Sequence, residues 1–167
     1  MMTNYFYPVC HDFLNRHNNA CISAYWANWD ACNLGAMIAM GVLCDNTNIY
    51  NEGVSYFKTS AGNGNISNAV PYLYAGNIGQ WQESGRDQEH APFGVGLLGS
   101  ACQVAWNQGL DLFSYANNRL LAGAEYVAQY NLGKSVPYTY YNNCSNSKNF
   151  WAAHNGRGRL DDRPLWN

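Results

Sequence analysis

One short segment of the chain gathers the side chains that acid–base chemistry requires. It runs from Gln82 to His90 with the sequence QESGRDQEH and leads into an apolar run. Arg86 and His90 are four positions apart, so a helical conformation would place both on one face with Gln82. An imidazole with an ordinary pKa near 6.5 suits a general base, and a guanidinium binds carboxylates through paired hydrogen bonds. The segment therefore predicts a proton-abstracting His90 beside an Arg86 that anchors an acidic substrate.

The same residues permit two other interpretations. Glu83, Asp87 or Glu89 could pair with Arg86 and only brace a loop. The three carboxylates could also serve a glycoside hydrolase, but all of them belong to one segment. A facing pair of catalytic carboxylates normally comes from separate loops, so hydrolysis is the less favoured chemistry.

The composition favours a carbohydrate ligand. Charged residues make up 12% of the 167 residues and the net charge is -2, while aromatic residues reach 15%. Aromatic rings stack on sugar rings, and amides bond to hydroxyls. We expect Trp81, Tyr74 and Gln82 to contact the sugar, whereas Trp29 is expected to pack in the core. The sequence has no run of Lys and Arg and no long apolar stretch, which argues against nucleic acid and against a membrane span as partners.

A basic cluster near the C-terminus could attract an acidic polymer. Its members are His154, Arg157, Arg159 and Arg163. Asp161 and Asp162 lie within the same stretch and could offset the charge, which would make it a solvated loop. Both interpretations stay open, and the three arginines are included among the expected substrate-binding residues.

The cysteines predict no metal centre, and we expect no cofactor. The six are Cys10, Cys21, Cys32, Cys44, Cys102 and Cys144, and no two have CxxC spacing. Cys32, Cys44 and Cys102 fall in apolar helical patterns, which favours free buried thiols. Cys21 and Cys144 fall in expected loops and could form a disulfide.

The composition is also typical of a protein outside the cytoplasm, although the first residues lack the pattern of a secretory signal. Asn65-Ile66-Ser67 and Asn143-Cys144-Ser145 match the acceptor pattern for N-glycosylation, which often occurs by chance. We expect a secreted or periplasmic protein.

The hydrophobic pattern predicts an all-α fold. Helices are expected over residues 3–16, 29–44, 93–106 and 117–130, with a shorter amphipathic one around Ile49 to Phe57. The helices at 29–44 and 93–106 are apolar nearly all round, each is followed by an amphipathic helix, and long loops cover 65–92 and 134–162. A unit of apolar helix, amphipathic helix and loop, used twice, predicts a partial (α/α) toroid with a cleft at the loop end. We expect residues 1–167 to form one incomplete domain of this kind, truncated at its C-terminus and at its N-terminus.

Several strings of the sequence resemble the alginate lyase family of polysaccharide lyases, in its branch found in fungi and bacteria. They are YWANWD at 25–30, GNG at 62–64, QWQESGRDQEH at 80–90, AWNQGLDL at 105–112, EY at 125–126 with YNLG at 130–133, and RGR at 157–159 with RPLW at 163–166. The resemblance implies an (α/α) toroid and β-elimination on uronic-acid polymers such as alginate or glucuronan, without a metal ion.

The resemblance also implies roles for particular residues. Asn28 matches the family's asparagine at the start of an inner helix, where its amide neutralises the substrate carboxylate; as a structural alternative it caps that helix. Many relatives carry histidine next, but here the next residue is Trp29, which moves the role of base to His90. Arg86 or Arg159 would help to neutralise the carboxylate, and a tyrosine would protonate the leaving oxygen. The family's usual tyrosine lies beyond position 167, so a non-catalytic carbohydrate-binding relative, or an inactive truncated product, is the alternative.

Overall fold

The structure is a computed structural model, and it describes residues 1–144. Its helices are α1 (Tyr7–Arg16), α2 (Ala27–Leu43), α3 (Thr47–Thr59), α4 (Ile66–Ala69), α5 (His90–Asn107) and α6 (Tyr115–Asn131). A π-helical turn covers Met2–Phe6, and 3₁₀ turns cover His17–Asn19 and Gln82–Gly85. The chain is mostly helical, as the sequence predicts. It also contains a small antiparallel sheet of β1 (Tyr72–Tyr74) and β2 (Ile78–Gln80), which the hydrophobic pattern did not predict.

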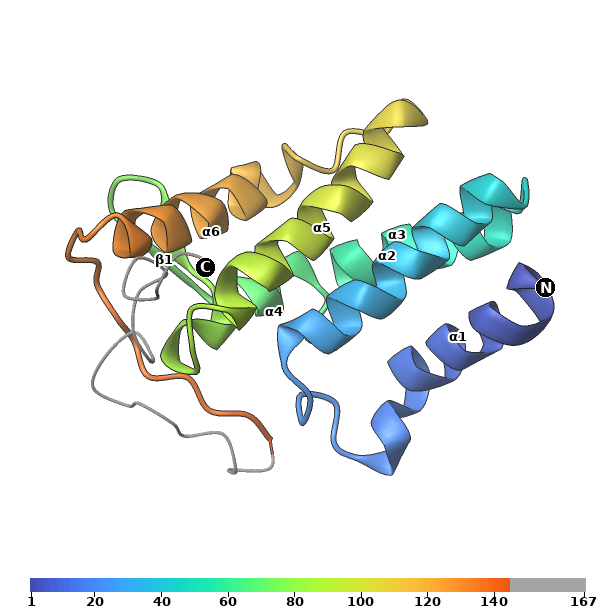
Figure 1. Cartoon of the computed structure of the whole chain (residues 1–167), viewed down its shortest axis with the longest axis horizontal. Helices are drawn as coiled ribbons and strands as arrows, with labels where there is room; N and C mark the ends of the chain where they lie inside the picture. The colour runs from blue at the N-terminus through green and yellow to red at the C-terminus, as the bar shows by residue number, and fades with distance from the viewer. Residues whose placement is uncertain (145–167) are drawn as a thin grey trace, which may run out of the picture.

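The two apolar helices, α2 and α5, lie side by side and run in the same direction (Figure 1). The chain returns from each through an amphipathic helix, α3 from α2 and α6 from α5, while α1 packs against α2. Small residues allow the central helices to approach closely, since a Cβ on Gly35 would lie 3.7 Å from the Cβ of Ala101. The N-termini of α2 and α5 therefore point toward the same end of the molecule.

Helix boundaries follow local sequence signals in some places and not in others. Pro8 lies in the first turn of α1, and Asn46 caps α3 by accepting hydrogen bonds from the N–H groups of Asn48 and Ile49. The first residue assigned to α6 is Tyr115, but residues 116–118 have left-handed backbone angles. The regular part of α6 thus begins after Asn118, close to the start that the sequence predicts at residue 117.

An extended segment, residues 137–144, crosses the loop end of the molecule; we call it the strap. The side-chain amide of Gln80 accepts the N–H of Thr139 and donates to its carbonyl, both at 2.7 Å. At its other end, the N–H of Cys144 donates to Ser23 Oγ at 2.9 Å, and a disulfide joins Cys144 to Cys21. The strap is thus fixed both to the small sheet and to the loop before α2.

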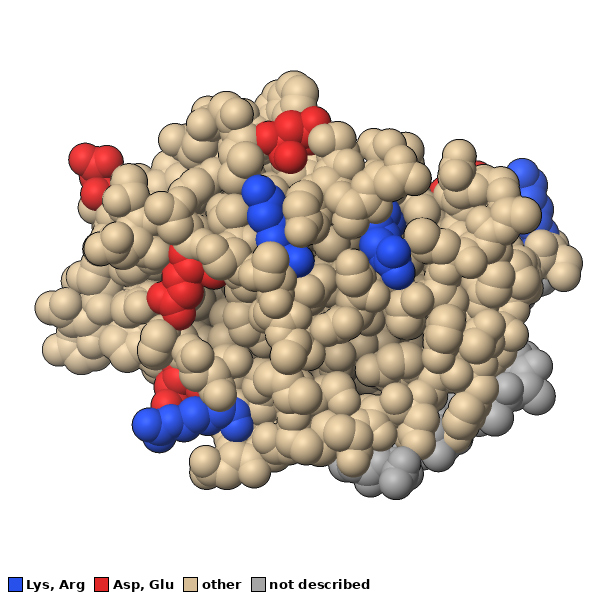
Figure 2. Space-filling model, turned by 180° about the vertical axis from the view of Figure 1, so that it is seen from behind, with Lys and Arg blue, Asp and Glu red and all other residues tan. Residues whose placement is uncertain are grey.

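The surface has few charges, as the composition requires. On the face in Figure 2, charged side chains are scattered among uncharged ones rather than gathered in a patch. Within residues 1–144, no helix has the length and apolar character needed to cross a membrane.

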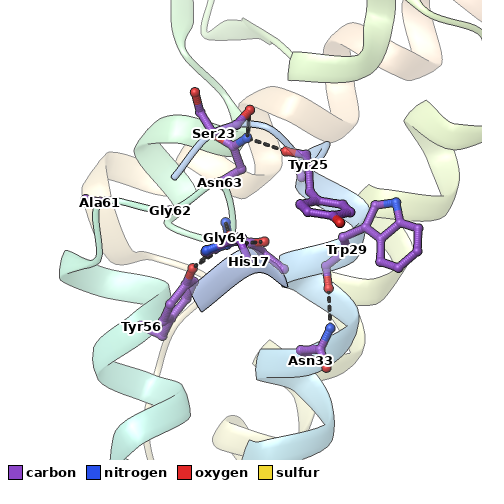
Figure 3. Close-up of polar contacts among 12 residues, drawn as sticks. His17, Ser23, Tyr25, Trp29, Asn33, Tyr56, Ala61, Gly62, Asn63 and Gly64 are labelled. Atoms are coloured by element: carbon purple, nitrogen blue, oxygen red, sulfur yellow. Dashed lines mark hydrogen bonds and ion pairs between the residues drawn. The ribbon is translucent and has the colours of Figure 1, made fainter. Parts of the chain in front are cut away.

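A buried ion pair ties the ends of α1, α2 and α3 together beneath the loop end. Nε2 of His17 lies 3.0 Å from Oδ1 of Asp30, and both side chains are fully buried. The hydroxyl of Tyr56 donates to Asp30 Oδ2 at 2.8 Å, and the Gly64 N–H donates to the same oxygen at 3.0 Å. Figure 3 shows His17, Tyr56 and Gly64 converging from three segments. Burial of this carboxylate is stabilised because each of its oxygens has a partner.

Gly62 leaves room for this ion pair, and we expect Gly62→Ala to lower the free energy of unfolding by about 2 kcal/mol. A Cβ at this position would overlap the Tyr56 hydroxyl and lie 2.7 Å from Asp30 Oδ2. Urea unfolding checks the value. Gly96→Ala is the matched control, because no atom lies within 4 Å of its added Cβ, and it should be neutral or slightly stabilising. Equal stability of the two variants would contradict the packing described for Gly62.

Candidate functional site

The N-terminus of α2 is capped from a distant part of the chain. Its own N-cap residue, Trp26, makes no side-chain cap hydrogen bond. Instead, Gln82 Oε1 accepts the N–H of Ala27 at 2.9 Å and Glu83 Oε2 accepts the N–H of Asn28 at 3.2 Å. These are two of the first-turn N–H groups that a helix leaves without intrahelical partners. The segment at residues 82–90 is therefore bound to the start of α2 while it leads into α5.

Arg86 lies between two carboxylates of its own segment. Its Nη1 donates to Glu83 Oε1 at 3.1 Å, and its Nε lies 3.7 Å from Asp87 Oδ2. Its guanidinium also lies 5.8 Å from the centre of the Trp26 ring. The bracing interactions considered from the sequence are thus present. Among the described residues, however, none forms a hydrogen bond with Nη2 of Arg86, so one side of the fork is open to a ligand.

His90 forms a dyad with Asp87. Its Nδ1 lies 2.8 Å from both oxygens of the Asp87 carboxylate, and its backbone N–H donates to Oδ1 at 2.8 Å. Burial by itself would raise the pKa of Asp87, but the hydrogen bonds from His90 and the charges of His90 and Arg86 outweigh it and lower that pKa. An ionised Asp87 holds the Nδ1 proton and orients the ring. No described residue forms a hydrogen bond with Nε2, so this nitrogen can act as a base.

Asn28 is not the cap of α2, because the cap position is Trp26 and the helix begins at Ala27. The Asn28 side chain is 7% exposed, and its Oδ1 is buried with no hydrogen-bond partner among the described residues. Buried polar groups are nearly always paired, so an unpaired amide oxygen requires an explanation. By contrast, the nearby side-chain amide of Gln82 forms hydrogen bonds through both its oxygen and its nitrogen.

Glu83 joins these groups and is completely buried, with an exposed fraction of 0%. Burial raises the pKa of its carboxyl to about 7, although the charge of Arg86, the Trp81 side chain and the N–H of Asn28 oppose the shift. Removal from water disfavours the charged form, and these contacts do not fully compensate for it. Asn28, Glu83, Arg86, Asp87 and His90 therefore form one continuous series of polar contacts.

The raised pKa of Glu83 predicts a pH-dependent stability. The folded state binds this proton more tightly than the unfolded chain, whose ordinary value is 4.5. The resulting stabilisation is complete below that value and is lost as the pH rises through about 7. Between about pH 5 and about pH 8, we expect wild type to lose roughly 2 kcal/mol of unfolding free energy relative to Glu83→Gln.

Urea unfolding of the two proteins at both pH values measures this difference. Glu89→Gln serves as the control, because Glu89 is an exposed carboxylate of the same segment. A difference that does not change with pH, or that matches the Glu89 control, would rule out the raised pKa.

The three residues predicted to contact a sugar have other partners in the structure. Trp81 is completely buried against Gly94, where an added Cβ would lie 2.8 Å from its Cε2. Gln82 is buried with its Oε1 on Ala27 and its Nε2 on the carbonyl of Asn68. Tyr74 has its hydroxyl 2.8 Å from Thr139 Oγ1, so it holds the strap. The structure therefore places Trp81 and Gln82 in the interior and Tyr74 against the strap, and the contact of these residues with a sugar stays a prediction.

Trp29 was expected in the core, but half of its side chain is exposed. It stacks on Phe13 with ring centres 5.8 Å apart and lines a hollow of about 500 Å³ between α1 and α2. The cysteines expected to be buried need a similar correction, since Cys32 of α2 is exposed and Cys44, which follows α2, is partly buried. Only Cys102 of the three is buried as predicted. An apolar helix in the sequence is thus covered on fewer sides than its composition suggests.

The strap brings tyrosines to this end of the molecule. The Tyr138 hydroxyl lies against Gly85, where an added Cβ would overlap it, and the Tyr141 ring centre lies 6.1 Å from that of Trp26. Burial raises the pKa of both hydroxyls to about 12, so they are protonated at neutral pH. The sequence left open whether Cys21 and Cys144 form a disulfide. They do, and the bond fixes the end of this segment.

The arginines predicted to bind substrate near the C-terminus, Arg157, Arg159 and Arg163, are outside residues 1–144, the part of the chain that the structure describes. Both asparagines of the glycosylation patterns are buried and bonded through Nδ2, Asn65 to the carbonyl of Ser60 and Asn143 to that of Ala24. Within residues 1–144, no group of three or more metal-binding side chains occurs.

Two hydrogen-bonded pairings were not predicted from the sequence. One joins Asp87 to His90, and the other joins Glu83 to the start of α2. Asp87 stands three residues before the first residue of α5, and that spacing is a usable signal for a side chain that accepts the helix's first N–H. The pairing of Glu83 with Asn28 spans 55 positions and has no local signal.

Comparison with known proteins identifies the family of this chain. A family model described as Alginate lyase matches residues 9–136, which include Asn28, Glu83, Arg86 and His90. No curated protein and no solved structure gives a significant match. The family match covers more than half of the chain and spans the helices that hold the candidate site. The chain therefore belongs to the alginate lyase family.

Proposed function

We propose that this protein is a polysaccharide lyase that cleaves a uronic-acid polymer by metal-independent β-elimination. Membership of the alginate lyase family supports a lyase acting on an acidic polysaccharide. The observation that carries the mechanism is the Asp87–His90 dyad, in which a carboxylate holds Nδ1 and leaves Nε2 without a partner among the described residues. That is the arrangement a general base requires.

The reaction breaks two bonds of one uronate residue. His90 Nε2 takes the proton at C5, the electrons form a C4–C5 double bond, and the C4–O bond to the next sugar breaks. The leaving oxygen takes a proton from an acid. The C5 proton becomes acidic only when the adjacent carboxylate is neutralised, because negative charge moves onto that carboxylate in the transition state.

Asn28 and Arg86 supply that neutralisation in our proposal. A carboxylate needs donors, and neither the side-chain NH₂ group of Asn28 nor Nη2 of Arg86 forms a hydrogen bond among residues 1–144. Both groups lie near the N-termini of parallel helices, whose dipoles favour an anion. A tyrosine supplies the acid, and the strap residues Tyr138 and Tyr141 are candidates because their raised pKa keeps them protonated.

The fold and location follow the same proposal. Two helix hairpins with α2 and α5 parallel at the centre match the repeat of an (α/α) toroid, and we propose that the chain is part of one. A disulfide that joins residues 123 positions apart favours an oxidising compartment. We therefore propose a secreted or periplasmic protein.

Incubation with alginate, with glucuronan and with a neutral glucan tests the function. Ultraviolet absorbance by the new C4–C5 double bond should appear with at least one polyuronate and be absent with the glucan. Heat-unfolded protein is the control. If oligouronates bind but no polyuronate yields the unsaturated product, the protein is a non-catalytic carbohydrate-binding relative and our proposal is wrong.

A further inference from the structure

We propose that Glu83 is a positioning residue that sets the distance between Asn28 and Arg86, the two groups that would hold the substrate carboxylate. This inference rests on the proposed function. Glu83 does not touch the substrate in this scheme, because it is completely buried and each of its two oxygens already has a partner. It acts through the residues on either side.

The contacts of Glu83 divide between two elements. Oε2 accepts the backbone N–H of Asn28 in the first turn of α2, at 3.2 Å. Oε1 accepts Nη1 of Arg86, which follows the 3₁₀ turn, at 3.1 Å. A single planar carboxylate thus links the backbone that carries one substrate-binding group to the side chain of the other. A shift of either element would break one of these hydrogen bonds.

The guanidinium of Arg86 is oriented by contacts on more than one edge. Glu83 holds Nη1, and Asp87 lies 3.7 Å from Nε on another edge. The face of the ion lies near the Trp26 ring, with 5.8 Å to its centre. These contacts hold the fork on two of its edges and leave Nη2 without a hydrogen bond among residues 1–144. A planar fork that is fixed in advance loses less entropy when it binds a carboxylate.

Stability alone does not account for a buried charge at this position. A neutral acceptor can cap the start of a helix, and Gln82 does so for Ala27 one residue away. Burying a carboxylate costs free energy that an ion pair rarely returns in full. The presence of a glutamate at position 83, next to Gln82, is explained if its second oxygen is needed for Arg86. Glutamine would present its oxygen to one of these two donors and its NH₂ group, itself a donor, to the other.

A double-mutant cycle on kcat/KM tests the role. Glu83→Gln should lower kcat/KM for the cleaved polyuronate by about tenfold to a hundredfold when Arg86 is intact. In an Arg86→Ala background, the same substitution should change kcat/KM by less than about threefold, because its effect passes through Arg86. Ser84→Ala, another buried residue of the same turn, is the control and should leave activity unchanged.

Each other outcome opposes the inference. Equal effects of Glu83→Gln in the two backgrounds would show a general structural role, and activity equal to that of Ser84→Ala would show none; in both cases the proposed lyase function still stands. If wild type cleaves no polyuronate, the proposed function fails, and the cycle is measured as oligouronate Kd by calorimetry, where additivity overturns the inference. Glu83→Asp replaces Glu83→Gln if the latter does not fold, because the shorter carboxylate cannot span both partners.

Discussion

Replacement of His90 by glutamine should lower kcat on the cleaved polyuronate by about 10²- to 10⁴-fold. Glutamine can form hydrogen bonds, but it cannot accept the C5 proton at neutral pH. The unfolding free energy should change little, because the side chain is partly exposed and bonds only to Asp87 among the described residues. Initial rates of double-bond formation and thermal melting, measured on the same preparations, separate loss of chemistry from loss of fold.

Replacement of Asp87, the other member of the dyad, should lower kcat less than replacement of His90. Asp87→Asn should lower kcat by about tenfold to a hundredfold, since an amide still bonds Nδ1 but no longer stabilises the charged ring. His11→Gln is the matched control, because His11 pairs with Glu52 at 2.5 Å on the surface of α1 and α3, away from the dyad. A His90 variant as active as the His11 variant would remove His90 from the mechanism and transfer the role of base to another residue.

Loss of the Cys21–Cys144 disulfide should lower the unfolding free energy by about 3 to 5 kcal/mol. The bond joins residues 123 positions apart, so it removes much of the entropy of the unfolded chain. Urea unfolding of wild type, with and without a thiol reductant, and of the Cys21→Ser, Cys144→Ser double variant measures the loss. The double variant should be insensitive to the reductant.

Cys32→Ser is the control for this prediction, because that thiol is exposed and outside the strap. It should remain within about 0.5 kcal/mol of wild type. A double variant as stable as wild type would mean that the hydrogen bonds of Thr139 and Cys144 hold the strap without the bond. Activity should fall with strap detachment if Tyr138 or Tyr141 supplies the acid.

Much of the helical framework could be predicted from local patterns. The runs that became α2 and α5 are apolar and rich in small residues, so their helical conformation and close approach could be predicted from composition. Asn46 caps α3 because asparagine at that position satisfies the first free N–H groups, which is a local effect. The pairing of Asp87 with His90 is also local, but it was not predicted.

The rest depends on contacts between distant segments. The strands β1 and β2 have three residues each, too few for an alternating pattern, and Gln80 is held by Thr139 of the strap. Trp29 is half exposed because composition gives the polarity of a helix but not which face a neighbour covers. Asn28 is freed from capping by a segment that follows it by 55 residues. His90, Arg86 and the carboxylates that could pair with Arg86 were identified by type and spacing, whereas the link from Glu83 to Asn28 required the fold.

The distant cap on α2 has a consequence for hydrogen exchange. First-turn amides of a helix usually exchange rapidly, because they have no partner within the helix and the end frays. In this chain the amides of Ala27 and Asn28 bond to buried side chains of the 3₁₀ turn at 82–85. Their protons can exchange only when that turn separates from α2. The two amides should therefore be protected as strongly as the helix interior. Their exchange rate would report how often the 3₁₀ turn at 82–85 separates from α2.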